Sequence, residues 1–439
     1  MFSRPTRTSP LNVLLPVIGS AGDVHPMLAL AIALQARGHR ATLLTNPLFQ
    51  PIIERQGVGF LPVGTLENAR EAIADPDLWH PRKGFGVVAQ RAILPTIPLV
   101  YRLIEQHADA NTVVASSGIA FGARLAQERL GIPTATVHLQ PTIIRSLVDQ
   151  GMMSNVRISA SQPMWFKRAL FRVADWLVID RVLKGPLNDF RATLGLAPID
   201  RVLHRWVHSP QLVIGFFPEW FAAPQPDWPA NTHLVGFPLW DDGGGTVPLP
   251  SDAEAFLAAG APPVVFTPGS AAATLHRFFA ESVTALRTLG VRAMLVTNFP
   301  EQVPTHLPPA VQTFGYLPFS ALLPRAAMLV YHGGIGTLSQ TIKAGIAHLV
   351  VPNGHDQFDN GWRIEQLGLG RSLPQTRYRA TAVVEAVGSL LADSLLKKRC
   401  RDFASRIDST AAVTRACELI EGLAPDVAIR PQSDGRAHA

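Results

Sequence analysis

The chain has 439 residues, of which 47% are hydrophobic and 16% are charged, so it is long enough for two globular α/β domains rather than one. The formal net charge is +6, but Lys and Arg are scattered, which argues against a nucleic-acid-binding protein and leaves anionic small molecules or lipids as partners. Cys400 and Cys417 lack metal-site or redox spacing, so we expect free thiols in a reducing cytoplasm.

The N-terminus is short and polar and is followed by the apolar run 11–18. This run is too short for a signal peptide and predicts a first strand instead. No stretch approaches the roughly eighteen apolar residues that span a bilayer. The sequence therefore predicts a cytoplasmic protein whose membrane contact is at most peripheral, at the inner face.

Residues 1–217 alternate between apolar runs and helical patterns, which predicts a Rossmann-like domain. A glycine loop, GSAGDVHP at 19–26, follows the first run, and we expect a helix to begin at Pro26 and close at Gly38. The loop lacks the G-x-G-x-x-G spacing of a dinucleotide site. The further strands are expected at 41–45, 57–63, 113–116, 134–138 and 212–216.

The regular pattern fails between residues 139 and 184, where apolar, aromatic and basic residues dominate. This segment is either an acceptor-binding insertion or a pair of helices that pack on the core, and its Lys and Arg could also contact a membrane surface. The residues proposed for an acceptor wall are Met152, Met153, Trp165 and Phe166.

Residues 218–250 are rich in Pro and Gly and read as an interdomain linker. A second Rossmann-like domain is expected over 251–407, with strands at 263–267, 292–297 and 311–314. A last helix over 408–424 is positioned to cross back to the first domain, and the tail 425–439 is expected to be disordered.

The most informative stretch is 327–360. An apolar run breaks at His332-Gly333-Gly334, and apolar residues at helical spacing follow, which predicts strand, turn and helix. Two glycines let the backbone approach a ligand, and the N–H groups and positive dipole end of the helix point at the turn. His332 and Thr337 add side-chain donors, so phosphate or pyrophosphate is the expected ligand.

A second apolar run, 349–352, delivers His355, Asp356 and Gln357 to the same edge of the sheet, because parallel strands end side by side. An acid and an amide at that place can hold hydroxyl groups. Phosphate donors beside hydroxyl acceptors indicate a nucleotide-sugar pocket.

HGGIGT at 332–337 followed by HDQFDN at 355–360 resembles the donor-binding signature of the family-1 glycosyltransferases. The resemblance implies the GT-B architecture, in which two Rossmann-like domains face each other across a cleft. It also implies a nucleotide-sugar co-substrate and no cofactor. The residues that match the family's donor contacts are, for the diphosphate, Ser270, His332, Gly333, Gly334, Gly336 and Thr337; for the base, Tyr316 and Leu317; for the sugar and its anchoring, Asp356, Gln357 and Asn360.

Transfer of the sugar to an acceptor hydroxyl needs a base, which is expected on the first domain, across the cleft from the donor. The loop GSAGDVHP offers Asp23 and His25. The loop resembles that of the sterol, glycopeptide and rhamnolipid branches, which implies that Asp23 is the base. His25 is the runner-up, because imidazole titrates nearer neutrality. The alternative without catalysis is that Asp23 caps the helix and His25 packs beside it.

No divalent metal is expected. The only D-x-D sequence is Asp75-Pro76-Asp77, which lies far from the phosphate stretch, and His332 with the helix after Gly333 is expected to replace the cation.

Aromatic stretches at 75–88 and 208–229 resemble the chain-B rhamnosyltransferases of rhamnolipid synthesis. This implies inverting transfer of L-rhamnose from dTDP-L-rhamnose to a hydroxyl of a 3-(3-hydroxyalkanoyloxy)alkanoate, in contact with a partner synthase subunit or the inner membrane. The alternative within the family is a UDP-glucosyltransferase acting on a sterol, macrolide or other apolar alcohol. A nucleotide-sugar epimerase and a non-catalytic lipid-binding subunit are the alternatives outside it.

Overall fold

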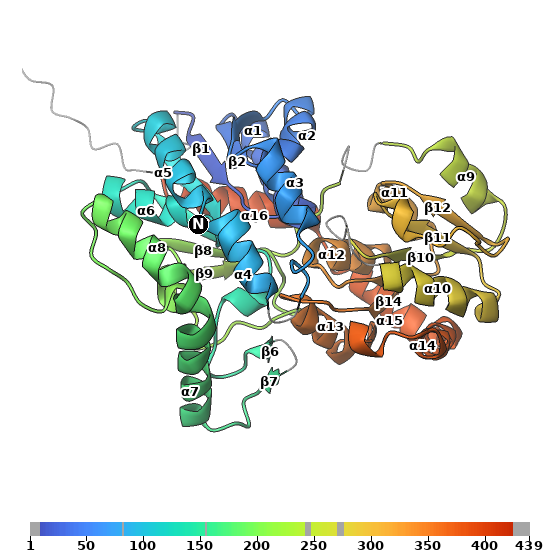
Figure 1. The fold of residues 1–439 in the computed structure, drawn as a ribbon. Helices are drawn as coiled ribbons and strands as arrows, with labels where there is room; N and C mark the ends of the chain where they lie inside the picture. The colour runs from blue at the N-terminus through green and yellow to red at the C-terminus, as the bar shows by residue number, and fades with distance from the viewer. Residues whose placement is uncertain (1–8, 81–82, 154–155, 242–246, 270–275, 425–439) are drawn as a thin grey trace, which may run out of the picture.

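The computed structural model describes residues 9–80, 83–153, 156–241, 247–269 and 276–424, and Figure 1 shows two α/β domains side by side. Ser270 and the tail 425–439 lie outside the described residues.

The first domain is built on a seven-stranded parallel sheet with the order β3-β2-β1-β4-β5-β8-β9. Its central strand β1 is buried throughout and pairs with β2 and β4, as its apolar sequence predicts. The strands are β1 (Asn12–Pro16), β2 (Arg40–Thr45), β3 (Gly59–Pro62), β4 (Thr112–Ser117), β5 (Thr134–His138), β8 (Leu212–Gly215) and β9 (Thr232–Leu234).

Helices cover both faces of this sheet, and a small antiparallel hairpin, β6 (Gly151–Met153) with β7 (Val156–Ile158), stands apart from it. The helices are α1 (Ala21–Ala36), α2 (Gln50–Arg55), α3 (Leu66–Ala74), α4 (Gly84–Val88), α5 (Thr96–His107), α6 (Phe121–Leu130), α7 (Met164–Ala174) and α8 (Asp180–Thr193).

The second domain has a six-stranded parallel sheet with the order β12-β11-β10-β13-β14-β15. Its strands are β10 (Val264–Thr267), β11 (Ala293–Val296), β12 (Val311–Phe314), β13 (Met328–Tyr331), β14 (Ala347–Val350) and β15 (Gly370–Ser372). Its helices are α9 (Ser251–Ala258), α10 (His276–Leu289), α11 (Phe319–Leu322), α12 (Ile335–Ala344), α13 (Gln357–Gln366), α14 (Ala380–Ala392) and α15 (Ser394–Ala404).

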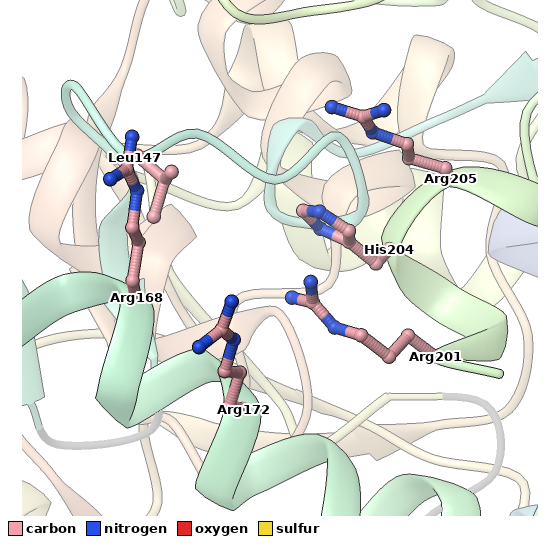
Figure 2. Close-up of a pocket in the computed structure, with 6 residues that line it drawn as sticks. All are labelled: Leu147, Arg168, Arg172, Arg201, His204 and Arg205. Atoms are coloured by element: carbon pink, nitrogen blue, oxygen red, sulfur yellow. The ribbon is translucent and has the colours of Figure 1, made fainter. Parts of the chain in front are cut away.

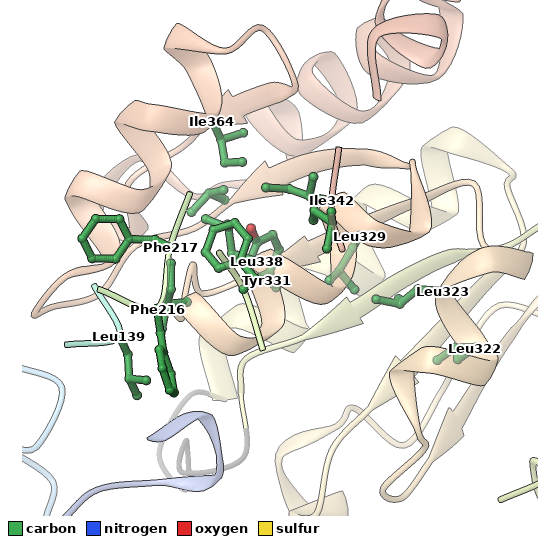
Figure 3. Close-up of a cluster of buried hydrophobic side chains, with 14 of the residues drawn as sticks. Leu139, Phe216, Phe217, Leu322, Leu323, Leu329, Tyr331, Leu338, Ile342 and Ile364 are labelled. Atoms are coloured by element: carbon green, nitrogen blue, oxygen red, sulfur yellow. The ribbon is translucent and has the colours of Figure 1, made fainter. Parts of the chain in front are cut away.

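The side chains on the two faces of β1 belong to two different hydrophobic clusters. Leu14 belongs to a cluster beneath α5, α6 and α8, whereas Val13 and Leu15 belong to a second cluster that continues into the other domain. Figure 3 shows part of the second cluster, whose labelled side chains include Phe216 of the first domain and Tyr331 of the second. The two sheets therefore share one continuous apolar interior.

The last helix, α16 (Ser409–Glu421), packs against α1 of the first domain. Glu421 near its end accepts from Arg37 Nε at 2.6 Å and lies 3.0 Å from His39 Nε2. The chain thus returns to the first domain after completing the second.

The structure differs from the sequence prediction at the start of α1 and at the end of the first sheet. The helix begins at Ala21 and runs through Pro26, because Ser20 and Asp23 form a start signal upstream of the proline. Strand β9 extends the first sheet beyond residue 217, into the stretch predicted as linker. It is three residues long and sits in Pro-rich sequence, so it leaves little periodicity to detect.

One helical run, 84–107, is long and apolar enough by length and composition to cross a membrane, contrary to the expectation that no stretch would approach that length. It joins α4 and α5 through a π-helical turn, and the sequence pattern had not revealed this continuity. Its α5 part packs tightly on α6, since a Cβ at Gly122 would lie 2.5 Å from the Ile97 carbonyl oxygen.

Candidate active site

The N-termini of α1 and α12 meet across the space between the two domains. A Cβ on Gly336, in the first turn of α12, would lie 3.1 Å from the Cα of Gly22 in the first turn of α1. Only glycine allows this approach. Both helices direct their positive ends to the same place, which favours an anionic ligand there.

Asp23 stands in the first turn of α1. Its Oδ2 accepts the Ser20 backbone N–H at 2.8 Å and the Ser20 hydroxyl at 3.2 Å, so the carboxylate does stabilise the helix start. The side chain is half-buried, yet burial is the largest effect on its pKa and raises it to about 6, against the opposing hydrogen bonds from Ser20. Both of these bonds use Oδ2, so Oδ1 is the oxygen that remains to accept a proton from a substrate.

His25 lies two residues further along α1. Its ring makes edge contacts with Trp240 at 5.1 Å and with Phe49 at 6.5 Å between ring centroids. Aromatic packing therefore fixes its orientation, on a surface shared with residue 240 of the segment between the sheets.

His332 ends β13 and is tightly enclosed. A Cβ at Gly269 or Gly334 would lie within 3.0 Å of the imidazole, and Gly333 has a φ of +94°, which favours glycine. Burial lowers the pKa of His332 to about 4, so the ring is neutral as the site stands. Its buried Nδ1 has no hydrogen-bond partner among the described residues. A neutral ring can still donate a hydrogen bond, and the expectation that His332 with the helix after Gly333 replaces a cation stays a prediction.

Asp356, Gln357 and Asn360 open α13. Asn360 Nδ2 donates to the Gly333 carbonyl at 2.9 Å and to Asp356 Oδ2 at 2.6 Å, so it ties the two predicted donor loops together. Gln357 Oε1 accepts from the backbone N–H groups of residues 353 and 354, so its carbonyl holds the turn. Burial, and then the charge of Asp23, raise the pKa of Asp356 to about 7.

Trp79 belongs to the same place, although it comes from the first domain. Its ring centroid lies 5.5 Å from that of His355 and 6.3 Å from that of His332. The sequence showed an aromatic loop at 75–88 but gave no sign that it reaches the second domain. The loop residue whose backbone also approaches this site is Leu78, with its carbonyl 3.3 Å from His355 Nε2.

The other predicted donor contacts are more dispersed. Thr337 is half-buried in the first turn of α12. Leu317 is buried in the core, so only its backbone could face a base, whereas Tyr316 is 47% exposed. Within the described part of the chain, no group of three or more His, Cys, Asp or Glu residues is placed to hold a metal ion.

Met152 and Met153 lie on the hairpin β6–β7, which reaches α13. The Met152 backbone N–H donates to Asp359 Oδ1 at 2.8 Å, and Asp359 also pairs with Arg363 at 2.5 Å. A Cβ at Gly151 would meet the Asp359 carboxylate, so glycine is required at that position. Both methionines are half-buried beside the donor domain.

Trp165 and Phe166 lie elsewhere, on α7, which Figure 1 shows projecting from the first domain. Trp165 is 71% exposed and Phe166 39% exposed. The alternative in which these two residues pack the core is therefore wrong. Their assignment to an acceptor wall stays a prediction.

Two protein-family models match the chain. The glycosyltransferase family 28 N-terminal domain matches residues 13–148, and the erythromycin biosynthesis protein CIII-like C-terminal domain matches residues 287–421. The two matches contain Asp23 and the 332–360 stretch respectively, so each includes one side of the site.

Curated relatives match over most of the chain. An O-mycaminosyltylonolide 6-deoxyallosyltransferase of Streptomyces fradiae is 27% identical over 94% of this chain and 97% of its own length. A sterol 3-beta-glucosyltransferase of Arabidopsis thaliana is 28% identical over 82% of this chain and 59% of its own length.

Solved structures share the fold. The glycosyltransferase of kitacinnamycin superposes with a TM-score of 0.71 at 20% identity, covering 95% of this chain and 100% of its own. The spinosyn rhamnosyltransferase superposes with a TM-score of 0.65 at 20% identity, covering 93% of this chain and 100% of its own.

Proposed function

We propose that this chain, a family-1 glycosyltransferase of the GT-B fold, transfers a 6-deoxyhexose, L-rhamnose in the first place, from its dTDP derivative to a hydroxyl of a hydrophobic acceptor. The observation that carries this proposal is the approach of Asp23 on one domain to Asp356 on the other, where the N-termini of α1 and α12 meet. This contact between the domains would bring a base, an anion site and a hydroxyl acceptor together.

The reaction follows from this placement. Asp23 Oδ1 takes the proton of the acceptor hydroxyl while that oxygen attacks the anomeric carbon of the sugar. The bond from that carbon to the diphosphate breaks, and the nucleoside diphosphate leaves with the electron pair. A single displacement inverts the anomeric centre, and it needs one base on the acceptor side, which Asp23 provides.

The leaving diphosphate gains negative charge in the transition state. We propose that the N–H groups in the first turn of α12 and a hydrogen bond from His332 stabilise that charge. A bound diphosphate would raise the pKa of the His332 imidazole, because an adjacent anion favours its charged form.

The choice of a 6-deoxyhexose is supported by Trp79. Its indole lies beside His332 and His355 and offers an apolar surface to a sugar methyl group, whereas a hydroxymethyl group would lose hydration there. The Streptomyces fradiae relative is named a 6-deoxyallosyltransferase, and the spinosyn rhamnosyltransferase has been solved with thymidine diphosphate.

The hydrophobic acceptor is supported by the hairpin β6–β7. Met152 and Met153 are held against α13 by the bond to Asp359, and flexible thioether side chains adapt to irregular apolar ligands. We propose a 3-(3-hydroxyalkanoyloxy)alkanoate as this acceptor. The spinosyn enzyme was solved with its aglycone, a different apolar acceptor, so the acceptor must be tested directly.

Thermal unfolding with a panel of nucleotide sugars tests the donor. At a hundred times its dissociation constant a donor adds about 2.7 kcal/mol to the free energy of unfolding. We expect dTDP-L-rhamnose to raise the melting temperature more than dTDP-glucose or UDP-glucose, and Trp79→Ala to reduce that preference. Product formation with a hydroxy-fatty acid dimer then tests the acceptor, and hydrolysis alone would contradict the proposal.

The second candidate is a UDP-glucosyltransferase acting on a sterol or another apolar alcohol, which the Arabidopsis thaliana relative favours. Asp356 and Asn360 would serve glucose as well as rhamnose, because both sugars present adjacent hydroxyls. Stronger stabilisation by UDP-glucose than by dTDP-L-rhamnose would select this candidate.

A further inference from the structure

We propose that the outer face of α7 and of the π-helical turn after it docks on a membrane surface that contains anionic phospholipid, with a lipid phosphate bound in an arginine-lined pocket beside the helix. This outer face is defined by its exposed large apolar residues, which are Met164, Trp165, Phe166, Val173, Trp176, Leu177 and Val178.

The outer face is unusual because it is apolar, although it lies opposite the side of the helix that packs on the domain. Every fourth residue faces the domain and is buried, from Lys167 through Phe171 and Asp175 to Ile179. The exposed side of a surface helix is ordinarily polar. Here Trp165 is 71% and Trp176 72% exposed, and contiguous exposed apolar residues mark an interaction site. Tryptophan is favoured where one side is apolar and the other wet, as at a bilayer surface.

A basic pocket adjoins this face. Arg168 and Arg172 of α7 converge with Arg201 and Arg205 on a cavity of about 220 Å³, and Figure 2 shows these side chains around a common space. The remaining lining residues are Leu147 and His204. Four guanidinium groups in one cavity match the oxygens of a phosphate.

The nearby acidic charge does not neutralise the pocket. Asp175 pairs with Arg201 at 2.8 Å but also with Arg145, so one carboxylate serves two arginines. His204 Nδ1 is buried and has no hydrogen-bond partner among the described residues. Burial, and then the charges of Arg201 and Arg145, lower the pKa of His204 to about 4.

The charge of the outer face also distinguishes between two docking partners, a membrane and a second copy of this chain. From residue 164 to residue 179 the only acidic side chain is Asp175, which is buried, so the accessible charges of the outer face are positive. Two such faces would repel each other. An anionic lipid surface attracts them, and each Arg near it strengthens that attraction.

The docking face is connected to the candidate active site. Lys167 Nζ, on the buried side of α7, donates to the carbonyls of Val148 at 3.0 Å and Ser159 at 3.2 Å. These two residues flank the hairpin β6–β7, whose Met152 contacts Asp359 of the other domain. If the proposed function holds, an apolar acceptor can pass from the bilayer along this hairpin, but docking itself does not depend on the reaction.

Vesicle co-sedimentation of the full-length protein tests the inference. We expect binding to vesicles of phosphatidylcholine mixed with phosphatidylglycerol, little binding to phosphatidylcholine alone, and weaker binding as salt is added. Trp165→Ala with Trp176→Ala, and separately Arg168→Ala with Arg172→Ala, should each lower the partition coefficient about tenfold or more. Melting temperatures should stay unchanged, since all four residues are exposed.

The matched control is Leu395→Ala with Lys398→Ala, an exposed leucine and lysine on α15 of the other domain, which should leave binding intact. Equal loss in the control would overturn the proposed face, and equal binding to both vesicles would overturn the phosphate pocket. Failure to bind either kind of vesicle would overturn the proposal that this face docks on a membrane. Sedimentation as a dimer that Trp165→Ala dissociates would overturn it too. Because donor-induced stabilisation is measured without vesicles, these failures remain distinct from a failure of the proposed reaction.

Discussion

Asp23 and Asp356 face each other from different domains, near enough that the charge of one raises the pKa of the other. Burial is the largest cause of the raised pKa of each carboxyl group, and the charge of Asp23 adds to it for Asp356. Two neighbouring carboxyl groups with raised pKa values indicate a place suited to hydroxyl groups and not to further negative charge.

We expect Asp23→Asn to abolish transfer while leaving donor affinity nearly unchanged, because the base acts on the acceptor. For the unmodified enzyme kcat/KM should fall as the pH is lowered through about 6, where Asp23 becomes protonated. Asp356→Asn should leave this fall in kcat/KM near the same pH, because Asp356, with its pKa near 7, is already largely neutral there. Transfer rates and donor titrations across pH would measure both effects.

His25→Ala is the matched control for that experiment. The ring packs against Phe49 and Trp240, so its removal should lower the melting temperature and leave a substantial transfer rate. If His25→Ala is inactive and Asp23→Asn is not, the base is His25.

Asp356→Asn should raise the melting temperature at about pH 8. A carboxyl group whose folded-state pKa is raised contributes stability below its unfolded value, and that contribution is lost as the pH rises through about 7. The gain from the amide should therefore vanish near the unfolded pKa of about 4. Asp189→Asn, at an exposed position on α8, should show no such pH-dependent gain. An equal gain at both pH values would mean that burial of charge is not the cause.

Gly336→Ala should weaken donor binding and transfer. Alanine in a helix is favoured over glycine by about 1 kcal/mol, but a Cβ at 336 would meet the Gly22 Cα at 3.1 Å. Gly388→Ala gains the same propensity within α14, where a Cβ would have no neighbour within 4 Å. We expect higher stability without loss of activity at 388, and loss of donor affinity at 336. If both variants gain stability and keep donor affinity equally, the contact between residue 336 and Gly22 is unimportant for donor binding.

Met152→Ala and Met153→Ala should raise KM for long-chain acceptors more than for short ones, with the KM of the donor unchanged. Each buried methylene contributes about 0.8 kcal/mol at most, so affinity should climb with chain length until the pocket is full. Val156→Ala, at a 51% exposed position on the same hairpin, is the control. A lower melting temperature with no change in chain-length preference would assign the methionines to packing only.

Full activity should survive excess EDTA. The first turn of α12 and His332 are available to the diphosphate, and we propose that they act without a cation. Steady-state rates after chelation, with magnesium or manganese added back, check this. Complete loss that either metal restores would require a cation in the mechanism.

The strands were predictable because buried parallel strands are continuous apolar runs; β5 occurs over the predicted residues, and β1 and β13 within one or two of them. The loops at their C-terminal ends were predictable for the same reason, and they bring Asp23 and the 332–360 stretch together. Trp79 was not predictable as a neighbour of His332, since long-range contacts leave no local pattern. Nor was the exposure of Trp165, because an apolar outer face reads like a core face until the packing partner is known.

The contact between Gly22 and Gly336 also bears on how much of the donor is lost to hydrolysis. An activated sugar can be lost to water whenever a water molecule reaches its anomeric carbon before the acceptor does. Here two helix backbones meet with no side chain between them, which narrows the space open to solvent at this point. If the proposed reaction holds, this close packing should slow the loss of bound donor to water until an acceptor arrives. A variant in which this contact is wider should hydrolyse its donor even when no acceptor is bound.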